Sequence, residues 1–571
     1  MLPNEPLQEA VRDLSVRVSV AELTDRLGHA VLPTEASAPE DDERSLLCVN
    51  PVTGEAFARV ACAGLQETEA AVEAASTALA LWRGVPFRER VQRLRRLAEI
   101  VHKQASSIAG LIALEQGKPV LEALTLEVMP ALDHLRYLVD HADRLYSLSE
   151  IEPRHPFYAH KRAHYLYDPI GIVALLTPYN LPFAVPLIRV GTALTMGNAV
   201  VLKPSESTPL CGLRIGELCL EAGFPPGLVG VLPMRREEAI LLAAHPKVDK
   251  VFVTGTLETG QHVMSAAGCA PRPVVLSLSG KHPSIVADDA DLDRAARGVV
   301  WGALANCGQN CGAIERVYVV ESVAARFVGQ VLGEVDRLRL GDPLNDEVDL
   351  GPLTSDSRRT EVHHQVSEAV SRGARLLRGG TLPEGPGFFY PPTVLLNPPA
   401  DCRLMREETL GPVIPIVVVE NLERALLLAN DSEYALSASG WTGSPVTAER
   451  LMVGLQAGVV TVNDVLYSFG EPAASWSGYK RSGIGHVHGT AGLREMCRQR
   501  FVSYDPRPAE APLLAFPYDG AARKLVEAGM TWIHGGSRMR RFRGLVRLLR
   551  SPRFRARMPR GFFTPWRQSP G

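Results

Sequence analysis

The chain has 571 residues, of which 46% are hydrophobic, and this length is too great for a single hydrophobic core. The composition excludes a disordered or fibrous protein and predicts two or more packed domains. The formal net charge is −2, but residues 523–571 contain thirteen lysine or arginine residues and one acidic residue, Glu527. The body of the chain is therefore acidic and its C-terminal tail is strongly basic.

Nine cysteines are scattered along the chain, and their odd number is a poor framework for disulfides. We expect free thiols in a reducing compartment. The N-terminal sequence lacks the basic start and long apolar core of a signal peptide, and no run of eighteen apolar residues appears in the chain. These features predict a cytoplasmic protein.

The first 46 residues contain one short amphipathic stretch, followed by a segment of proline, alanine, serine and acidic residues. We expect residues 1–46 to form a leader and linker. Apolar side chains recur at helical spacing in residues 67–82 and 88–115, which predicts two long surface helices.

Two series of short runs rich in β-branched residues follow, with helix-length segments between them. The first series comprises residues 170–176, 199–202, 229–232 and 250–253. The second series comprises residues 284–287, 316–320 and 413–418. Strands that alternate with helices indicate parallel sheets covered by helices on both faces, so we predict two α/β domains in tandem.

A loop of small residues at 306–312 carries two thiols, Cys307 and Cys311. A thiolate is a strong nucleophile, and backbone N–H groups near a helix start can lower its pKa and hold an oxyanion. The alternative for any single cysteine is a small buried hydrophobic residue. A metal site would need a second cysteine or histidine pair of matching spacing, and the sequence contains none, so we expect no metal.

This loop is one of eight short motifs that occur in the following order along the chain: residues 50–55, 114–119, 177–182, 202–206, 252–256 with Gly260, 306–312, 408–413 and 478–483. Over residues 50 to about 505 the chain resembles the NAD(P)-dependent aldehyde dehydrogenase superfamily. Any one motif could arise by chance, whereas eight in family order do not.

The resemblance implies an α/β fold with three parts: a Rossmann-type cofactor domain, an α/β catalytic domain and a β oligomerisation arm. The expected boundaries are 47–150 and 166–278 for the dinucleotide-binding domain, 279–455 for the catalytic domain, and 151–165 and 456–505 for the arm, with 506–571 as a basic C-terminal extension. A long projecting hairpin has no core of its own, so the arm should add its strand to a neighbour's sheet and give a homodimer or homotetramer.

The catalytic residues implied by the resemblance are Cys311 and Asn180. Cys311 matches the family nucleophile, which adds to an aldehyde and gives a thiohemiacetal whose oxygen becomes negative. Asn180 matches the asparagine whose side-chain N–H stabilises that oxygen beside the backbone N–H of Cys311. Cys307 matches a variable position, and we expect it to be a packing residue. Transfer of hydride to the nicotinamide then leaves a thioester on Cys311.

Five residues are implied in cofactor binding. Lys203 and Glu206 follow a predicted strand, where they would hydrogen-bond the adenosine ribose, although a solvated strand end is the alternative for these two taken alone. Thr256, after Gly255, would place a helix N-terminus against the pyrophosphate. Glu408 matches the glutamate that holds the nicotinamide ribose. A carboxylate at Glu206 would repel a 2′-phosphate, so NAD is favoured, with NADP as the alternative.

The chain departs from the family in the groups that handle protons. Ser277 stands where the family has the glutamate that activates water, and a serine hydroxyl cannot accept a proton near neutral pH. Arg189 replaces a lysine, and Val487, between His486 and His488, replaces a second glutamate. One explanation is a hydrolytic enzyme with another base, for example a histidine or cofactor-ordered water. Others are transfer of the acyl group to coenzyme A, and a slow or reductive enzyme.

Residues 508–571 lie outside the resemblance. Within them, residues 538–550 place Phe542, Leu545, Val546 and Leu549 on one helical face with arginines around it. Such a segment can lie on an anionic membrane surface, grip an acidic partner or dock on the chain's own acidic body. We expect no nucleic-acid binding. Two functional classes remain: an active NAD-dependent aldehyde dehydrogenase acting on a small aldehyde, and a catalytically weak body that binds a membrane or partner.

Overall fold

The computed structural model describes residues 45–146, 149–153, 155–506, 508, 513–514, 516 and 518–558. Apart from its last two residues, the leader and linker expected at 1–46 lies outside them. The chain divides into two compact units. The first comprises the residues up to Leu145 and Pro169–Arg498, and the second comprises Tyr146–Asp168 and the chain from Gln499 on.

One sheet of the first unit has six strands in the order β19-β9-β8-β5-β6-β7. Its parallel strands are β5 (Ile172–Leu176), β6 (Ala199–Lys203), β7 (Val229–Val231), β8 (Lys250–Thr254) and β9 (Val274–Ser277), and β19 (Gly483–Ile484) pairs antiparallel with β9. The four strands predicted in the first series are confirmed. Their aliphatic side chains are buried on both faces, as in sheets covered by helices.

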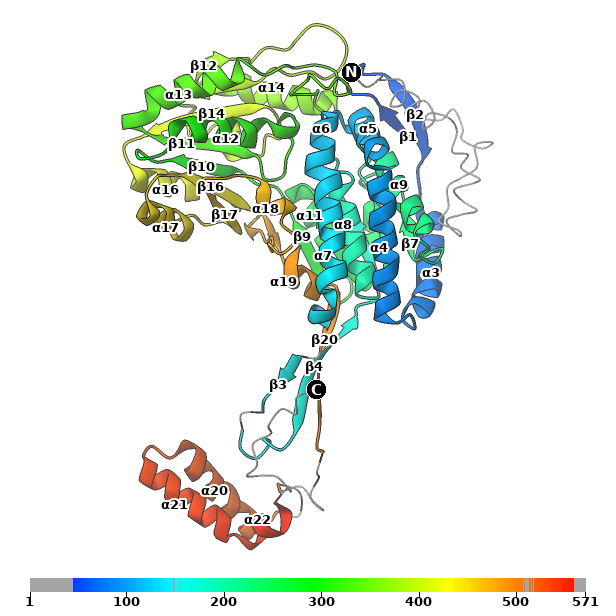
Figure 1. Cartoon of the computed structure of the whole chain (residues 1–571), viewed down its shortest axis with the longest axis vertical. Coiled ribbons are helices and arrows are strands. Elements are labelled where there is room, and N and C mark those ends of the chain that lie inside the picture. The colour runs from blue at the N-terminus through cyan, green and yellow to red at the C-terminus, as the bar shows by residue number, and fades with distance from the viewer. Residues whose placement is uncertain are drawn as a thin grey trace. The chain divides into compact units, whose positions relative to one another are not determined.

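Helices flank this sheet (Figure 1). They are α3 (Leu65–Trp82), α4 (Phe87–Lys103), α5 (Ala105–Gln116), α6 (Val120–Ala123), α7 (Met129–Tyr146), α8 (Ala184–Thr195), α9 (Pro209–Glu221), α10 (Ala239–Ala244) and α11 (Leu257–Ala267). The helix predicted at 67–82 is confirmed. The helix predicted at 88–115 is interrupted at Gln104, where the backbone leaves the helical conformation, so α4 and α5 replace it.

The second sheet of this unit has seven strands in the order β12-β13-β14-β11-β10-β16-β17. They are β10 (His282–Val286), β11 (Ile314–Val320), β12 (Arg375–Arg378), β13 (Thr393–Leu396), β14 (Val413–Val419), β16 (Ser437–Trp441) and β17 (Val459–Val462). All pairings are parallel except that of β12. The three strands predicted in the second series are confirmed.

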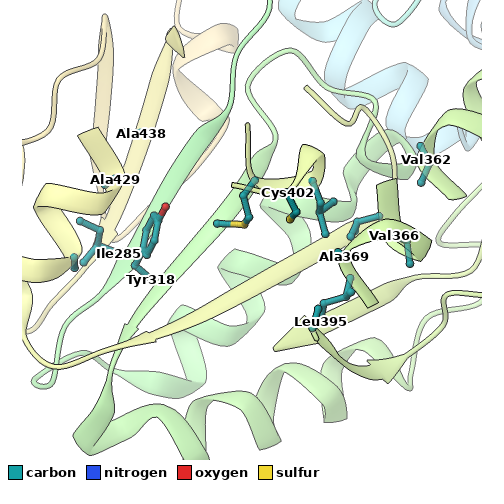
Figure 2. Packing of buried hydrophobic residues seen from close by; sticks show 14 of the residues in the cluster. Ile285, Tyr318, Val362, Val366, Ala369, Leu395, Cys402, Ala429 and Ala438 are labelled. Carbon is teal, nitrogen blue, oxygen red and sulfur yellow. The ribbon is translucent and has the colours of Figure 1, made fainter. Parts of the chain in front are cut away.

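The core of the seven-stranded sheet forms on both of its faces. One cluster includes Ile285, Tyr318 and Leu395 from strands and packs against α14 (Asp356–Ser371), α16 (Leu422–Asn430) and α17 (Pro445–Gly454); Figure 2 shows part of it. The other packs the sheet against α12 (Leu292–Leu304) and α13 (Glu321–Val335). Both sheets are therefore helix-covered, as the alternation of strands and helices predicted.

The predicted limits of the arm differ from the structure. Residues 456–505 were expected to belong to it, but β17 lies in the seven-stranded sheet and β19 extends the six-stranded sheet. Pairing satisfies the backbone of β17 at the free edge of β16. Only the part of this range from Gln499 on belongs to the second unit.

The second unit contains a three-stranded sheet, β20-β4-β3, and a helical segment. The strands are β3 (Ser149–Ile151), β4 (Arg162–Pro169) and β20 (Cys497–Tyr504), and the helices are α20 (Gly520–His534), α21 (Arg538–Arg550) and α22 (Pro552–Arg557). Their core consists of Phe157, Leu525, Ala528, Leu548 and Phe554. Helices α20, α21 and α22 of the basic tail therefore pack with Phe157 of the arm segment.

The helix predicted at 538–550 is confirmed as α21, but the face that it buries differs from the apolar face picked out from the sequence. The buried residues of α21 are Gly544 and Leu548, whereas Phe542 and Leu549 are exposed. Gly544 turns that face inward because a Cβ atom there would lie 2.3 Å from the backbone nitrogen of Trp532 in α20. Among the described residues, no helix is long and apolar enough to cross a membrane.

Replacing Phe157 with alanine should loosen the helical segment of the second unit. Phe157 is buried and packs on Gly529 of α20, so the truncation removes about 3–5 kcal/mol of local stability. Amide hydrogen exchange in α20–α22 should accelerate. Tyr158→Ala is the matched control, because the neighbouring Tyr158 is exposed. Equal protection in both variants would contradict this packing.

Candidate active site

A cavity of about 270 Å³ lies at the carboxyl ends of β5, β6, β8 and β9. Ligands bind at this edge of parallel sheets. All eight residues singled out from the sequence line it: Asn180, Lys203, Glu206, Gly255, Thr256, Ser277, Cys311 and Glu408. We call it the first cavity. Residues more than 200 positions apart in the chain therefore line one cavity.

The loop before Cys311 has an unusual backbone. Asn306 and Cys307 have φ angles of 57° and 52°, and Gly308 has a φ angle of 70°. A Cβ atom on Gly308 would lie 2.1 Å from the carbonyl oxygen of Gly411, so only glycine fits there. These turns place Cys307 in the core, where it is 1% exposed, and Cys311 at the cavity.

A buried ion pair fixes the backbone of Asn180. The Lys118 ammonium lies 2.5 Å from the Glu127 carboxylate, and both side chains are fully buried. Lys118 and the Asn306 side-chain amide donate hydrogen bonds to the Asn180 carbonyl oxygen at 2.8 and 3.0 Å. Glu127 accepts two backbone N–H groups at the start of α8. The Asn180 carbonyl is therefore held from behind while its side chain lines the first cavity.

Sequence reasoning did not single out this pair. Lys118 lies in the quoted motif 114–119, and a lysine between glycine and proline in an apolar context was a signal that it is buried. Glu127 lies outside every motif. Glu127 lies in the π-helical turn at Leu124–Val128, and this turn places its side chain next to Lys118. Sequence periodicity does not reveal such a turn.

The surroundings of Cys311 raise the pKa of its thiol. Burial raises its pKa to about 11, and the charge of Glu408 adds to this effect, while Arg189 and Lys118 lower the pKa. Arg189 is itself buried, which lowers its pKa to about 10. Before ligands bind, Cys311 is therefore a thiol at neutral pH. A positive charge next to the sulfur would favour the thiolate.

Glu408 is held beside the β9 end of the first cavity. Its carboxylate accepts hydrogen bonds from the Ser279 hydroxyl at 2.7 Å and from the Gly280 N–H at 3.1 Å. Burial, together with the nearby charge of Glu315, raises the pKa of Glu408 to about 7. A buried Lys281–Glu315 pair, at 2.7 Å, anchors the segment that follows Glu408. Ser277 at the end of β9 lines the same cavity.

The opposite end of the first cavity combines Lys203, Glu206 and Arg236. Glu206 accepts a hydrogen bond from the Arg236 N–H at 2.6 Å, and burial lowers the pKa of Lys203 while Glu206 raises it. Arg236 was missed in the sequence because it lies in no motif. It adds a cation near the position expected for a ribose.

The N-terminus of α11 faces the first cavity between these ends. Thr256 caps the helix by accepting a hydrogen bond from the Thr259 N–H at 3.3 Å. A Cβ atom on Gly255 would meet nothing within 4 Å, so the protein leaves this space open. A capped helix start that faces an open space, with a carboxylate at each end of the cavity to accept hydrogen bonds from hydroxyl groups, fits a dinucleotide.

A second cavity of about 400 Å³ lies beside the loop that carries Cys311. Asn310 lines it, and its neighbour Cys311 lines the first cavity, so the reactive loop separates the two. Its wall is rich in aromatic side chains and carries two carboxylates: Trp301, Tyr467, Phe469, Trp476, Asp133 and Glu471. Asn310, Leu466 and Phe469 also line the second cavity, whereas Tyr179 lines the first cavity.

Glu408→Gln should increase the reactivity of Cys311 above neutral pH. The ionised carboxylate raises the pKa of the thiol, so its removal increases the thiolate fraction. Glu408 is largely protonated below its pKa of about 7. Alkylation by iodoacetamide should therefore be alike in both proteins at about pH 6 and faster in the variant at about pH 9. Glu407→Gln, an exposed neighbour, is the control. Equal rates at the higher pH would refute the coupling.

Comparisons with known proteins agree with this geometry. The sequence model of the Aldehyde dehydrogenase family matches residues 38–502. Aminoaldehyde dehydrogenase 2, peroxisomal, from Malus domestica is 35% identical over 470 residues, covering 80% of this chain and 93% of the relative. Mitochondrial succinate-semialdehyde dehydrogenase from Arabidopsis thaliana is 36% identical over 462 residues, covering 81% and 86%.

A solved structure confirms the predicted fold. The NAD+ complex structure of an aldehyde dehydrogenase from Bacillus cereus is similar, with a TM-score of 0.78 and 30% identity, over 81% of this chain and 94% of that chain. A family match over most of the chain and relatives above 30% identity agree with the motif order and the cavity. The chain therefore belongs to the aldehyde dehydrogenase family.

Proposed function

We propose that the protein oxidises an aldehyde to the carboxylic acid, with Cys311 as nucleophile and Asn180 as oxyanion donor. The observation that carries the proposal is the first cavity, where both residues lie beside Lys203, Glu206, Thr256 and Glu408. A bound oxidised nicotinamide supplies a hydride acceptor and a positive charge.

The chain's own residues perform the other steps. The Cys311 sulfur bonds to the aldehyde carbon, and the carbonyl oxygen becomes an oxyanion. The Asn180 side-chain N–H and the Cys311 backbone N–H donate hydrogen bonds to it. Loss of hydride from the same carbon gives the thioester, and water then replaces sulfur at that carbon. The Lys118–Glu127 ion pair holds the backbone of Asn180, so the side-chain N–H of Asn180 is already positioned before the oxyanion forms. Hydrogen-bond donors that are positioned in advance stabilise an oxyanion most effectively.

We propose NAD as the cofactor, with NADP as the alternative. Glu206 favours NAD because its carboxylate would repel a 2′-phosphate, and the NAD+ complex of the Bacillus cereus structure supports this preference. Arg236 acts in the opposite direction because its guanidinium could pair with such a phosphate. Measuring kcat/KM with both cofactors in Glu206→Gln and Arg236→Ala separates the two effects.

The second cavity favours an aldehyde with a distal cationic group. Asp133 and Glu471 line it without an ion-pair partner among the described residues, and the charge of Glu471 acts to raise the pKa of Asp133 and of His134. Aromatic faces beside carboxylates attract ammonium groups. The aminoaldehyde dehydrogenase of Malus domestica supports this class.

Transfer of the acyl group to coenzyme A is a second candidate. Ser277 favours it, because the thioester would persist until a thiol attacks if no base activates water. A catalytically weak body that binds a membrane is not proposed, since the family match ends at residue 502 and lends the basic tail no membrane role.

We further propose that the arm pairs with a second copy in a homodimer or homotetramer. The edges of the small sheet β20-β4-β3 provide unpaired backbone groups for this contact. Two relatives are named as peroxisomal and mitochondrial, so the cytoplasmic location stays a prediction from the sequence.

Replacing the two thiols of the reactive loop should give opposite results. Cys311→Ala should abolish aldehyde-dependent NADH formation, because the thiohemiacetal cannot form. Cys307→Ala should retain most of it, since that side chain lies in the core. Absorbance at the NADH wavelength with equal active-site concentrations is the measurement. Equal loss in both variants would overturn the assignment of Cys311.

Neutralising the rim of the second cavity should change substrate preference. Asp133 and Glu471 are exposed, so each is worth at most about 1 kcal/mol, or roughly fivefold, toward a cationic substrate. Asp133→Asn and Glu471→Gln should raise KM for 4-aminobutanal by about that factor each and leave KM for butanal unchanged. Succinic semialdehyde tests the opposite charge. A wild-type preference for succinic semialdehyde would refute the cationic class.

A further inference from the structure

Helix α21 has two different faces. Gly544 and Leu548 are buried, and they face α20, which lies beside α21 (Figure 1). Four apolar side chains recur on the opposite face at intervals of three and four residues: Met539, Phe542, Val546 and Leu549. This spacing places them in one row along the helix. Met539 and Phe542 are 62% and 63% exposed, so packing within the second unit leaves this row open. We call it the outer stripe.

Arginines border the outer stripe, and no carboxylate of the described residues neutralises their charges. Helix α21 contains six arginines and no acidic residue. The ion pairs of the surrounding described segment join Arg523 to Glu527 and Arg553 to Asp519, outside α21. All six arginines of the helix are exposed: Arg538, Arg540, Arg541, Arg543, Arg547 and Arg550. Helix α21 therefore presents six positive charges to its surroundings.

Other exposed apolar side chains accompany the outer stripe in the second unit. Val526 and Met530 of α20 are exposed. The exposed rings of Phe516 and Tyr518, just before α20, lie 4.5 Å apart between centroids. Residues 559–571 lie outside the described residues, but their sequence continues this composition with three aromatic residues, two arginines and no acidic residue. Exposed apolar side chains that gather in this way mark interaction sites.

This combination suits an anionic lipid surface. A helix with an apolar row bordered by arginines lies in the plane of a bilayer. Its apolar side chains enter the boundary between headgroups and acyl chains, and its arginines bind anionic headgroups. With 13 residues, α21 is too short to span a bilayer, so it can bind only along the surface. Charge complementarity therefore identifies the lipid class as anionic.

Other polyanions match the outer stripe less well. A nucleic acid would pair its phosphates with the arginines, but its contacts are mainly polar and would leave the apolar row in water. An acidic protein would need an apolar groove bordered by carboxylates. The family match ends at residue 502, so the role of α21 has to follow from its own chemistry. A lipid surface accommodates the apolar row and the arginines together.

We propose that α21 attaches the protein to an anionic membrane surface, with the outer stripe inserted below the headgroups and the arginines paired with their phosphates. This attachment is separate from the reaction at Cys311 and involves no membrane-spanning segment. A single short amphipathic helix gives weak, reversible binding, and each arginine near the surface strengthens it about fivefold. Attachment should therefore depend on lipid charge and on salt.

Vesicle sedimentation of the full-length protein tests the proposal. Wild type should sediment with vesicles of equimolar phosphatidylcholine and phosphatidylglycerol and stay in the supernatant with pure phosphatidylcholine. Raising the salt concentration from about 0.1 M to about 1 M should release the protein, because the Debye length falls from about 10 Å to about 3 Å. Failure of wild type to sediment with the anionic vesicles, or equal sedimentation with both kinds, would refute the proposal.

Two variants separate the apolar row from the arginines. Phe542→Ser should weaken vesicle binding at least about tenfold, because insertion of the ring removes a large apolar surface from water. Arg543→Gln, Arg547→Gln and Arg550→Gln together should weaken binding about 10²-fold. The triple variant should also show a smaller dependence on salt, because fewer charges contact the headgroups.

Matched variants test whether these effects are specific. Leu427→Ser in α16 and Arg95→Gln with Arg96→Gln in α4 change exposed residues of the first unit and should bind as wild type does. Phe542→Leu keeps the apolar row, and lysine at the same three α21 positions keeps the charge, so both should retain binding. All variants should form NADH from aldehyde at the wild-type rate in solution, because none of these residues lies in the first cavity.

Unchanged sedimentation of both Phe542→Ser and the triple glutamine variant would show that α21 is not the attachment site. Weaker binding of the first-unit controls would contradict the proposal in the same way. Binding to double-stranded DNA that exceeds vesicle binding and is unaffected by Phe542→Ser would assign the arginines to a nucleic acid instead. The Cys311 proposal is independent of these outcomes, since it fails only if Cys311→Ala retains activity.

Discussion

The arrangement of the active site depends on the buried Lys118–Glu127 ion pair. A charge placed in a protein interior is costly unless it is paired and hydrogen-bonded, and removing one partner costs about 3–5 kcal/mol. Here both charged groups form further hydrogen bonds: the Lys118 ammonium donates one to the Asn180 carbonyl, and the Glu127 carboxylate accepts one from the backbone at the start of α8. The same pair therefore fixes the turn that carries Asn180 and the helix that carries Arg189.

Two further buried charges set the electrostatics around this frame. Burial keeps the Cys311 sulfur in the thiol form; Glu408 acts in the same direction and Arg189 acts against it. This arrangement protects a reactive side chain from oxidants and alkylating compounds, because the thiolate is the species that reacts. The Lys281–Glu315 pair fixes the backbone that follows Glu408, just as the Lys118–Glu127 pair fixes the backbone of Asn180.

Local patterns predicted the strands and most helices correctly. Runs such as Ile172–Leu176 contain residues that suit only a buried strand, and the motif order brought eight site residues into one cavity. The failures involve partners far apart in the chain. Val459–Val462 could be recognised as a strand but not as a neighbour of β16, and the inner face of α21 depends on the small Gly544 against α20. His134 and His488 meet across about 350 residues without any local signal.

The packing of Phe157 has a consequence for synthesis on the ribosome. Its partners in α20 begin at Leu525, so about 370 residues separate the ring from the segment that covers it. At typical elongation rates of about 5–20 residues per second, synthesis of the α20 segment that packs on Phe157 follows on the order of 20–75 seconds later. During that interval the arm segment of a nascent chain exposes an apolar ring, and chaperone demand should be greatest in this window.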